Sequence, residues 1–471
     1  MPEYWYSRWL FERALAAIYC VAFIAAAAQF VPLLGEHGLE PVGRWIEQVP
    51  FRASPSLFYL FPRDSAFRVC AWLGIALSVF ALSSMPQQAG PWASAAVWAA
   101  LWLLYLSFVN VGQTFYGFGW ETLLCEVGFF TIFAGAGRMA PNMWLIWIWR
   151  WTLFRLMFGA GLIKLRGDSC WRDLTCLNYY FETQPMPNAL SWYFHWLPEA
   201  VHKGGVAFNH FVELLVPFGY FAPQPIATVA GLLTIAFQGV LIVSGNLSWL
   251  NWLTVTLCIP TLDDRFLSWL PLAPPLLHEP SLVHRGAIYA LAAVVAVLSV
   301  APTLNMLSAS QIMNTSFEPF HLVNTYGAFG GITRTRYEIV IEGTDDETVS
   351  SATKWREYEF KGKPGDPNRR APQIAPYHLR LDWLMWFEAF APQPQDQWFI
   401  TLLQRLLRGD PATVSLLHTN PFPDHPPRFL RARYYRYWFT TPEERRRTGR
   451  WWNRQLAGEY VPAITLAAFD R

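Results

Sequence analysis

The stretch that decides the fold is the uncharged run Ala14–Leu34, ALAAIYCVAFIAAAAQFVPLL. A helix needs about 20 mostly apolar residues to cross the hydrocarbon core of a bilayer, and this run has that length. A cleaved signal peptide is not expected, because aromatic residues crowd in front of the run and the hydrophobic pattern extends past the length of a signal sequence. The run therefore predicts a transmembrane helix.

Further apolar segments follow along the first two-thirds of the chain. They are Ala66–Leu82, Trp92–Val111, Phe118–Ala136, Met143–Leu165, Val206–Phe221, Ile226–Ser244, Leu247–Leu262 and Ala287–Leu307. Two of these, Phe118–Ala136 and Leu247–Leu262, are short or carry acidic residues and could be re-entrant or interfacial. Residues 1–310 are therefore predicted to form an α-helical polytopic membrane bundle of about nine spans. A long extramembrane loop is expected at about 166–205.

Composition supports a membrane protein rather than a soluble enzyme. Charged residues make up 15% of the 471 residues and hydrophobic residues 53%, whereas an ordinary soluble domain is about a quarter charged. A formal net charge of +2 provides no field that would attract nucleic acid, so no nucleic-acid partner is expected. The expected partner is membrane lipid.

The charges gather towards the C-terminus, where residues 311–471 hold 39 of them against 31 in residues 1–310. Alternating side chains in Arg336–Glu342 and Trp355–Phe360 predict two strands around a polar turn. Leu381–Phe390 and Gln397–Leu407 predict amphipathic helices. Arg428–Phe439 predicts a strand with aromatic and arginine side chains on both faces. Residues 311–471 are therefore predicted to form a soluble, β-rich α+β domain.

Three cations lie in or at the end of one predicted span, Met143–Leu165: Arg150, Arg155 and Lys164. A cation at the centre of a span costs roughly 2.5–3.5 kcal/mol on insertion scales, so each needs a partner or water. The candidate partners are the carboxylates of Glu121, Glu126 and Glu213. Two interpretations stay open: buried ion pairs that fix the packing of the helices, or a path for protons or substrate. Lys164 could also snorkel to the membrane surface.

His210 and Glu213 are three residues apart on a predicted helix and share a face. Such a pair can hydrogen-bond in the core, bind metal or move protons. Further ligands at suitable spacing are missing, as are the glycine-rich and nucleophile motifs of cofactor and hydrolase sites, so neither metal nor cofactor is predicted. Cys170 and Cys176 are candidates for a disulfide if their side of the membrane is oxidising.

Several long motifs resemble the lipase maturation factor family. The most specific is FRLMFGAGLIKLRGDSCWRDLTCLNYYFETQPMPNALSWY (Phe154–Tyr193), and FGWETLLCEVGF (Phe118–Phe129), NHFVELLVPF (Asn209–Phe218) and FHLVNTYGAFGGITRTRYE (Phe320–Glu338) are others. The likeness covers nearly the whole chain in order. It implies a polytopic membrane protein whose animal members lie in the endoplasmic reticulum and help dimeric lipases to fold and assemble.

The resemblance also implies a location and a partner. The C-terminal domain is expected on the lumenal or periplasmic side, where it would handle a secreted, lipase-like client. Because the chain ends Ala-Phe-Asp-Arg, without a retention signal, and starts close to its first span, we expect a bacterial relative in the inner membrane, or the endoplasmic reticulum if the source is eukaryotic.

A more distant likeness concerns Phe158–Trp171, FGAGLIKLRGDSCW, which is similar to a membrane segment of vitamin K-dependent gamma-carboxylase. The lysine that acts as the base in that enzyme matches Lys164.

Two functions follow from these likenesses. The first is a maturation factor that is not an enzyme, with Arg431, Arg433, Tyr435 and Tyr437 as candidate client contacts. The second is a membrane enzyme that acts on a hydrophobic or lipid-like substrate with Lys164 as base.

Overall fold

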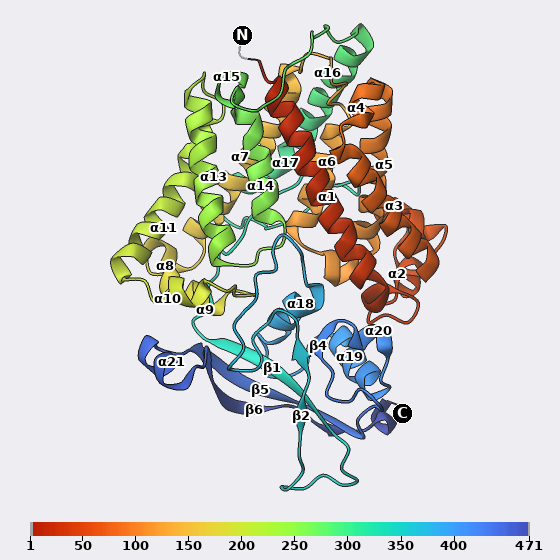
Figure 1. Cartoon of the computed structure of the whole chain (residues 1–471), viewed down its shortest axis with the longest axis vertical. Coiled ribbons are helices and arrows are strands. Elements are labelled where there is room, and N and C mark those ends of the chain that lie inside the picture. The colour runs from red at the N-terminus through yellow and green to blue at the C-terminus, as the bar shows by residue number, and fades with distance from the viewer. Residues whose placement is uncertain (1–2, 470–471) are drawn as a thin grey trace.

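A bundle of helices stands on a C-terminal domain built around an antiparallel sheet (Figure 1) in the computed structural model, which describes residues 3–469. This is the predicted order of a helical membrane-type region followed by a sheet-containing domain. The helices of the bundle are α1 (Trp5–Leu34), α2 (Val42–Gln48), α3 (Asp64–Leu82), α4 (Met85–Ala89), α5 (Pro91–Val111), α6 (Gly119–Thr131), α7 (Met143–Arg166), α8 (Ser169–Arg172), α9 (Leu177–Thr183), α10 (Ser191–His195), α11 (Glu199–Leu214), α12 (Val216–Gly219), α13 (Ile226–Ser244), α14 (Leu250–Cys258), α15 (Asp264–Leu267), α16 (Leu282–Leu298) and α17 (Val300–Leu307).

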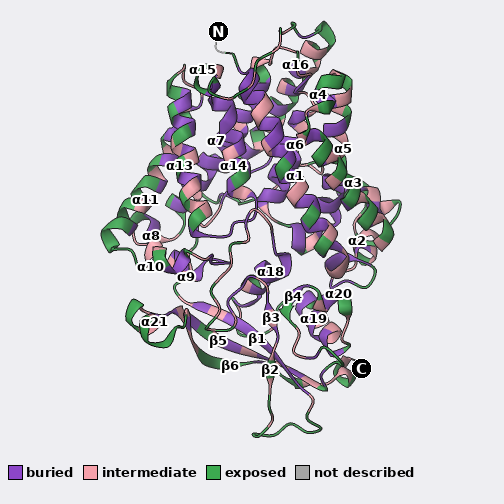
Figure 2. Ribbon diagram, viewed as in Figure 1, coloured by how far each residue is buried: buried purple, intermediate pink, exposed green. Residues whose placement is uncertain are grey.

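Among the described residues, 5 helical stretches are long and apolar enough to cross a membrane: α1, α3, α5, α13, and α16 with α17. Figure 2 shows exposed residues along these helices. Large apolar side chains such as Trp72 in α3, Val229 in α13 and Val297 in α16 are among the exposed ones. An apolar surface of this kind suits contact with lipid.

The predicted count of about nine spans is not confirmed, and the remaining segments differ from a simple span for separate reasons. α6 has 13 residues and is almost entirely buried, so at 1.5 Å per residue it is too short to cross alone. α7 is long enough, at 24 residues, but carries four cations: Arg150, Arg155 and Lys164, and Arg166 at its end. The segment Val206–Phe221 is divided between α11 and α12, and α14 has only 9 residues.

The predicted extramembrane loop at 166–205 is largely helical and packs under the bundle as α8, α9, α10 and the start of α11. His195 and His202 lie in α10 and α11. The indole Nε1 of Trp192 in α10 donates to the carbonyl oxygen of Thr440 at 2.8 Å. This segment therefore connects the bundle to the C-terminal domain.

The C-terminal domain contains a four-stranded antiparallel sheet in the order β2-β1-β5-β6 and a small pair of β3 and β4. Two of the predicted strands and both predicted helices are present, and Gln397–Leu407 forms a helix with those bounds. The strand predicted over Trp355–Phe360 is divided into two short strands that belong to different sheets. The elements of the domain are β1 (Arg336–Thr344), β2 (Arg356–Glu357), β3 (Glu359–Phe360), α18 (Arg380–Glu388), α19 (Gln397–Leu407), α20 (Pro411–Val414), β4 (Leu417–Thr419), β5 (Phe429–Phe439), α21 (Pro442–Thr448) and β6 (Trp452–Ile464).

The sheet is covered on different faces at its two ends. Near the start of β5, the buried side chains are Leu430, Ala432 and Tyr434, on the face against which α18 and α19 pack. Near its end the buried side chains are Tyr437 and Phe439, on the opposite face, where they cluster with Trp192. Arg431 and Arg433 consequently lie on a face of β5 that is open at one end of the strand and closed at the other.

Candidate functional site

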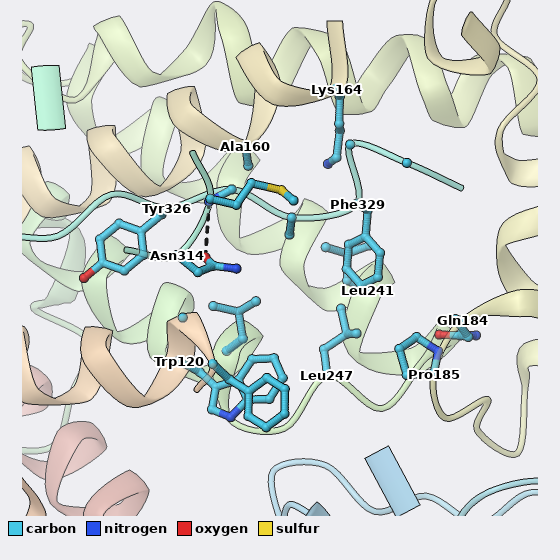
Figure 3. A pocket seen from close by; sticks show the side chains of 18 of the residues that line it. Trp120, Ala160, Lys164, Gln184, Pro185, Leu241, Leu247, Asn314, Tyr326 and Phe329 are labelled. Carbon is cyan, nitrogen blue, oxygen red and sulfur yellow. Dashed lines mark hydrogen bonds between the residues drawn. The ribbon is translucent and has the colours of Figure 1, made fainter. Parts of the chain in front are cut away.

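A cavity of about 590 Å³ lies where the bundle meets the C-terminal domain. Its walls come from α6, α7, α13, α14 and α18 and from the segment 313–333, which runs back from the last span into the bundle. Most of the lining is apolar, and Figure 3 shows Trp120, Ala160, Leu241, Leu247 and Phe329 around the space. A cavity of this size and character fits one small apolar molecule.

Lys164 lies on the cavity wall, and two acceptors of the protein bind its Nζ. Its Nζ is 2.5 Å from Glu213 Oε1 and donates to Asn209 Oδ1 at 2.9 Å. Asn209 Nδ2 donates to the other oxygen of Glu213, also at 2.9 Å. A lysine that acts as a base needs its Nζ free to approach the substrate, and here a carboxylate and an amide oxygen already hold the Nζ. The geometry therefore suits a structural pair better than a base.

Glu126 is the centre of the largest buried network. It forms an ion pair with Arg155 and accepts hydrogen bonds from the Thr152 hydroxyl at 2.9 Å and the Tyr326 hydroxyl at 2.7 Å. Asn324 donates to it twice, from its backbone nitrogen at 3.0 Å and its side chain at 2.9 Å. These bonds fix the segment that contains Asn324 and Tyr326 inside the bundle.

Glu121 does not pair with any of the cations of α7. Its partner is Arg380 of α18, whose Nη1 donates to Glu121 Oε1 at 2.7 Å and to the Phe115 carbonyl oxygen at 2.7 Å. The guanidinium also lies 3.4 Å above the centre of the Tyr116 ring. Both charged side chains are 0% exposed, so this ion pair joins the C-terminal domain to the bundle through its interior.

Arg150 has no carboxylate partner among residues 3–469. It donates to the carbonyl oxygens of Pro260 at 2.9 Å and Tyr220 at 3.1 Å and to the Tyr4 hydroxyl at 2.9 Å. Carbonyl oxygens at helix ends lack intrahelical donors, so the guanidinium satisfies groups that would otherwise be unpaired.

His210 and Glu213 do not form the predicted hydrogen-bonded pair. His210 Nε2 lies 2.9 Å from the Trp171 carbonyl oxygen, while Glu213 faces Lys164. In the described part of the chain no group of three or more histidine, cysteine, aspartate or glutamate residues could hold a metal ion.

Cys170 and Cys176 are joined by a disulfide with a Cα–Cα distance of 4.8 Å. The adjacent Asp168 lines the cavity and forms a bidentate pair with Arg334, at 2.6 and 2.8 Å. The Arg334 guanidinium holds the pKa of the Asp168 carboxyl down, at about 2. A disulfide and an ion pair therefore both stabilise the segment that follows α7.

The four predicted client contacts share one face of β5, as strand alternation requires, but they differ in exposure. The side chains of Arg431 and Arg433 are 17% and 31% exposed and lie at 2.6 and 3.7 Å from Glu342. Tyr435 is half-buried. Tyr437 is buried and donates to the Gly365 carbonyl oxygen at 2.8 Å, so its ring is not available to a partner.

Several residues of these networks were missed by reasoning from the sequence. They are Arg380, Asn209, Asn324 and Tyr326, and a buried ionic cluster of Arg336, Glu338 and Lys363 in which Arg336 also donates to carbonyl oxygens of residues 182 and 185. Alternation in β1 places Arg336 and Glu338 on one face, which was an available signal. Nothing local to Arg380 indicated a partner in α6.

Two family models match the chain and together cover most of it. One is described as the lipase maturation factor transmembrane domain and matches residues 6–269, and the other as the lipase maturation factor C-terminal domain and matches residues 322–462. No solved structure matches the chain significantly.

Curated relatives match over nearly the whole chain. Lipase maturation factor 1 from Bos taurus is 42% identical over 98% of this chain and 89% of the relative, and the Homo sapiens protein is 42% identical over 98% and 88%. Lipase maturation factor 2 from Homo sapiens is 29% identical over 98% of this chain and 82% of the relative. These matches give no support to the enzyme interpretation.

Proposed function

Because the chain belongs to the lipase maturation factor family, we propose that this multi-pass membrane protein assists the folding or assembly of secreted, lipase-like client proteins. The observation that carries the proposal is the buried attachment of the C-terminal domain. Arg380 inserts into the bundle to reach Glu121, and residues 324–326 are held by Glu126. A domain attached in this way can present a fixed surface to a client beside the membrane.

The client surface that we propose is the open end of the sheet face around Arg431 and Arg433. The Arg431 guanidinium lies 3.9 Å above the centre of the Trp355 ring, and both arginines share the single carboxylate of Glu342. Arginine and aromatic side chains are enriched in protein interfaces, where they combine apolar area with hydrogen-bond donors. This surface lies on the face of β5 opposite to the face that packs against α18 and α19, where it could cover apolar groups of an incompletely folded client.

We place the C-terminal domain on an oxidising side of the membrane, either the periplasmic side of a bacterial inner membrane or the lumenal side of the endoplasmic reticulum. The disulfide supports this, because Cys170 and Cys176 are in the segment that packs on the C-terminal domain and disulfides persist in oxidising compartments.

For the path through the membrane we propose nine passes. Five are the long apolar stretches, and four are the shorter, broken or charged segments α6, α7, α11 with α12, and α14. An odd number puts the N-terminus and the C-terminal domain on opposite sides, which agrees with their positions at opposite ends of the bundle in Figure 1.

The proposal can be tested by restoring lipase secretion. Cells that lack their own maturation factor would express this chain with a secreted lipase, and secreted activity would be divided by total lipase protein. Wild type should restore activity, whereas Arg431→Ser/Arg433→Ser should lose at least fivefold at equal protein level. The matched control is Arg446→Ser/Arg447→Ser, which removes two exposed arginines from α21. Equal activity of the two double variants would reject this client surface, and failure of the wild type would reject the function.

A further inference from the structure

The charges on the wall of the cavity are compensated before any molecule enters it. Lys164 is paired with Glu213, and Asp168 is paired with Arg334. The remaining polar side chains of the wall, such as Gln238 and Asn251, are neutral, and Asn251 Nδ2 donates to Gln238 Oε1 at 2.7 Å. An anion or cation in this space would be an additional charge without a partner in an apolar environment, which is strongly unfavourable. The charge balance therefore selects an uncharged occupant.

The cavity also provides one place for a polar group. A lysine ammonium has three donors, and Lys164 uses two of them on Glu213 and Asn209. Figure 3 shows its Nζ directed towards the space that Ala160 and Phe329 border. The third N–H can donate to an uncharged acceptor such as an ester or carbonyl oxygen, while the apolar walls of Leu241 and Leu247 suit a hydrocarbon chain.

The exposed residues at the entrance of the cavity indicate that its occupant comes from the membrane. Met313, Phe387 and Phe390 line the cavity yet are 43%, 42% and 53% exposed. Met313 lies six residues after Leu307, where α17 and the last apolar stretch end, while Phe387 lies in α18 and Phe390 two residues beyond its end. An exposed apolar rim at this level of the molecule lets an acyl chain enter from the bilayer surface.

The size of the space argues against a segment of a client. A helix with its side chains is about 10 Å wide and rises 1.5 Å per residue, so a cavity of about 590 Å³ holds only about five residues of it. Pockets of about 300–1,000 Å³ commonly hold one small molecule and bury most of its surface.

We infer that this cavity is a binding site for an uncharged membrane lipid with one acyl chain and an ester oxygen, the chemistry that a monoacylglycerol has. The acyl chain lies between α7, α13 and α14, and the ester oxygen accepts from Lys164. The lipid is bound and not transformed. The inference goes beyond the proposed function, because it does not depend on any client protein.

Native mass spectrometry of the full-length protein in detergent tests the site, with 1-oleoylglycerol and oleate as probes that share one chain but differ in charge. Wild type should form a one-to-one complex with 1-oleoylglycerol and bind oleate at least tenfold more weakly. Leu241→Trp fills the cavity from α13 and should weaken binding of 1-oleoylglycerol at least tenfold. Leu232→Trp is the matched control, because Leu232 is on the same helix but 36% exposed and outside the cavity lining, and it should bind as wild type does.

Two further variants separate loss of the site from loss of the fold. Ala160→Leu narrows the cavity from α7 and should also weaken binding, with an unchanged gel-filtration profile. The double variant Lys164→Met/Glu213→Leu removes both charges together. It should still bind an oleyl hydrocarbon, but its preference for 1-oleoylglycerol over that hydrocarbon should be smaller than in the wild type. The inference is overturned if oleate binds as tightly as 1-oleoylglycerol, if folded Leu241→Trp and Ala160→Leu both bind as wild type, or if 1-oleoylglycerol does not bind.

Discussion

The ion pair between Arg380 and Glu121 provides the sharpest test of how the two parts of the molecule are held together. Arg380→Met keeps much of the side-chain volume but leaves the Glu121 carboxylate buried without its cation. Loss of one partner of a buried pair costs about 3–5 kcal/mol of unfolding free energy, and here a contact with the Tyr116 ring is lost as well. Replacing both charges, as in Arg380→Met/Glu121→Leu, leaves no unpaired charge and should recover most of this loss.

Denaturant unfolding in detergent, with limited proteolysis as a second readout of domain attachment, would measure these differences. The control is Arg428→Met, which breaks the exposed pair with Glu347, 58% and 85% exposed, and should cost at most about 1 kcal/mol. If Arg380→Met costs no more than Arg428→Met, or if the double variant loses the sum of the two single losses, the reasoning about a buried charge is refuted.

Three other predictions concern the ties around this junction. Glu126→Gln should cost about 3 kcal/mol, because Arg155 loses its buried counter-ion; thermal unfolding checks this, and a cost near zero would contradict it. Cys170→Ser/Cys176→Ser should lower stability by about 2 kcal/mol for so short a loop, and alkylation before reduction should leave these two cysteines unlabelled; labelling of both would contradict the disulfide. Burial, reinforced by the Asp396 carboxylate, raises the pKa of Glu40 to about 7, above the value of 4.5 for an unperturbed glutamate. The folded state then binds the proton more tightly, so stability present below pH 4.5 should be lost as the pH rises towards 7. Glu40→Gln should remove that loss and be more stable by about 1 kcal/mol at pH 8, a value reduced for solvent screening of a partly exposed group; an unchanged pH profile would argue against this role.

Local sequence patterns predicted most helices and strands of the C-terminal domain. They did not predict which residues that are distant in the sequence are in contact. Gln397–Leu407 and the strands around Arg336 and Arg431 follow from periodicity and turn residues. The sequence also indicated that the cations of α7 need partners, because a buried charge is costly. Arg155 and Lys164 pair with two of the candidate carboxylates, whereas Arg150 binds carbonyl oxygens. The partner of Glu121 lies 259 residues away in α18, and no periodicity carries that information.

The exposure of β5 shows the same limit. Alternation places Arg431, Arg433, Tyr435 and Tyr437 on one face, and the structure agrees. Which end of that face is covered depends on α10 and on residues near Gly365, which approach from other parts of the chain. The alternation of side chains along β5 could therefore not predict that Tyr437 is buried.

The central claim is that the C-terminal domain works while fixed to the membrane bundle. The most direct measurement is secreted lipase activity, per unit of lipase protein, in cells that express Arg380→Met or Arg380→Met/Glu121→Leu in place of their own maturation factor. The account predicts that the single variant loses activity together with protease resistance of the domain junction and that the double variant regains both. Wild-type lipase activity from an Arg380→Met protein whose junction is open to protease would contradict it.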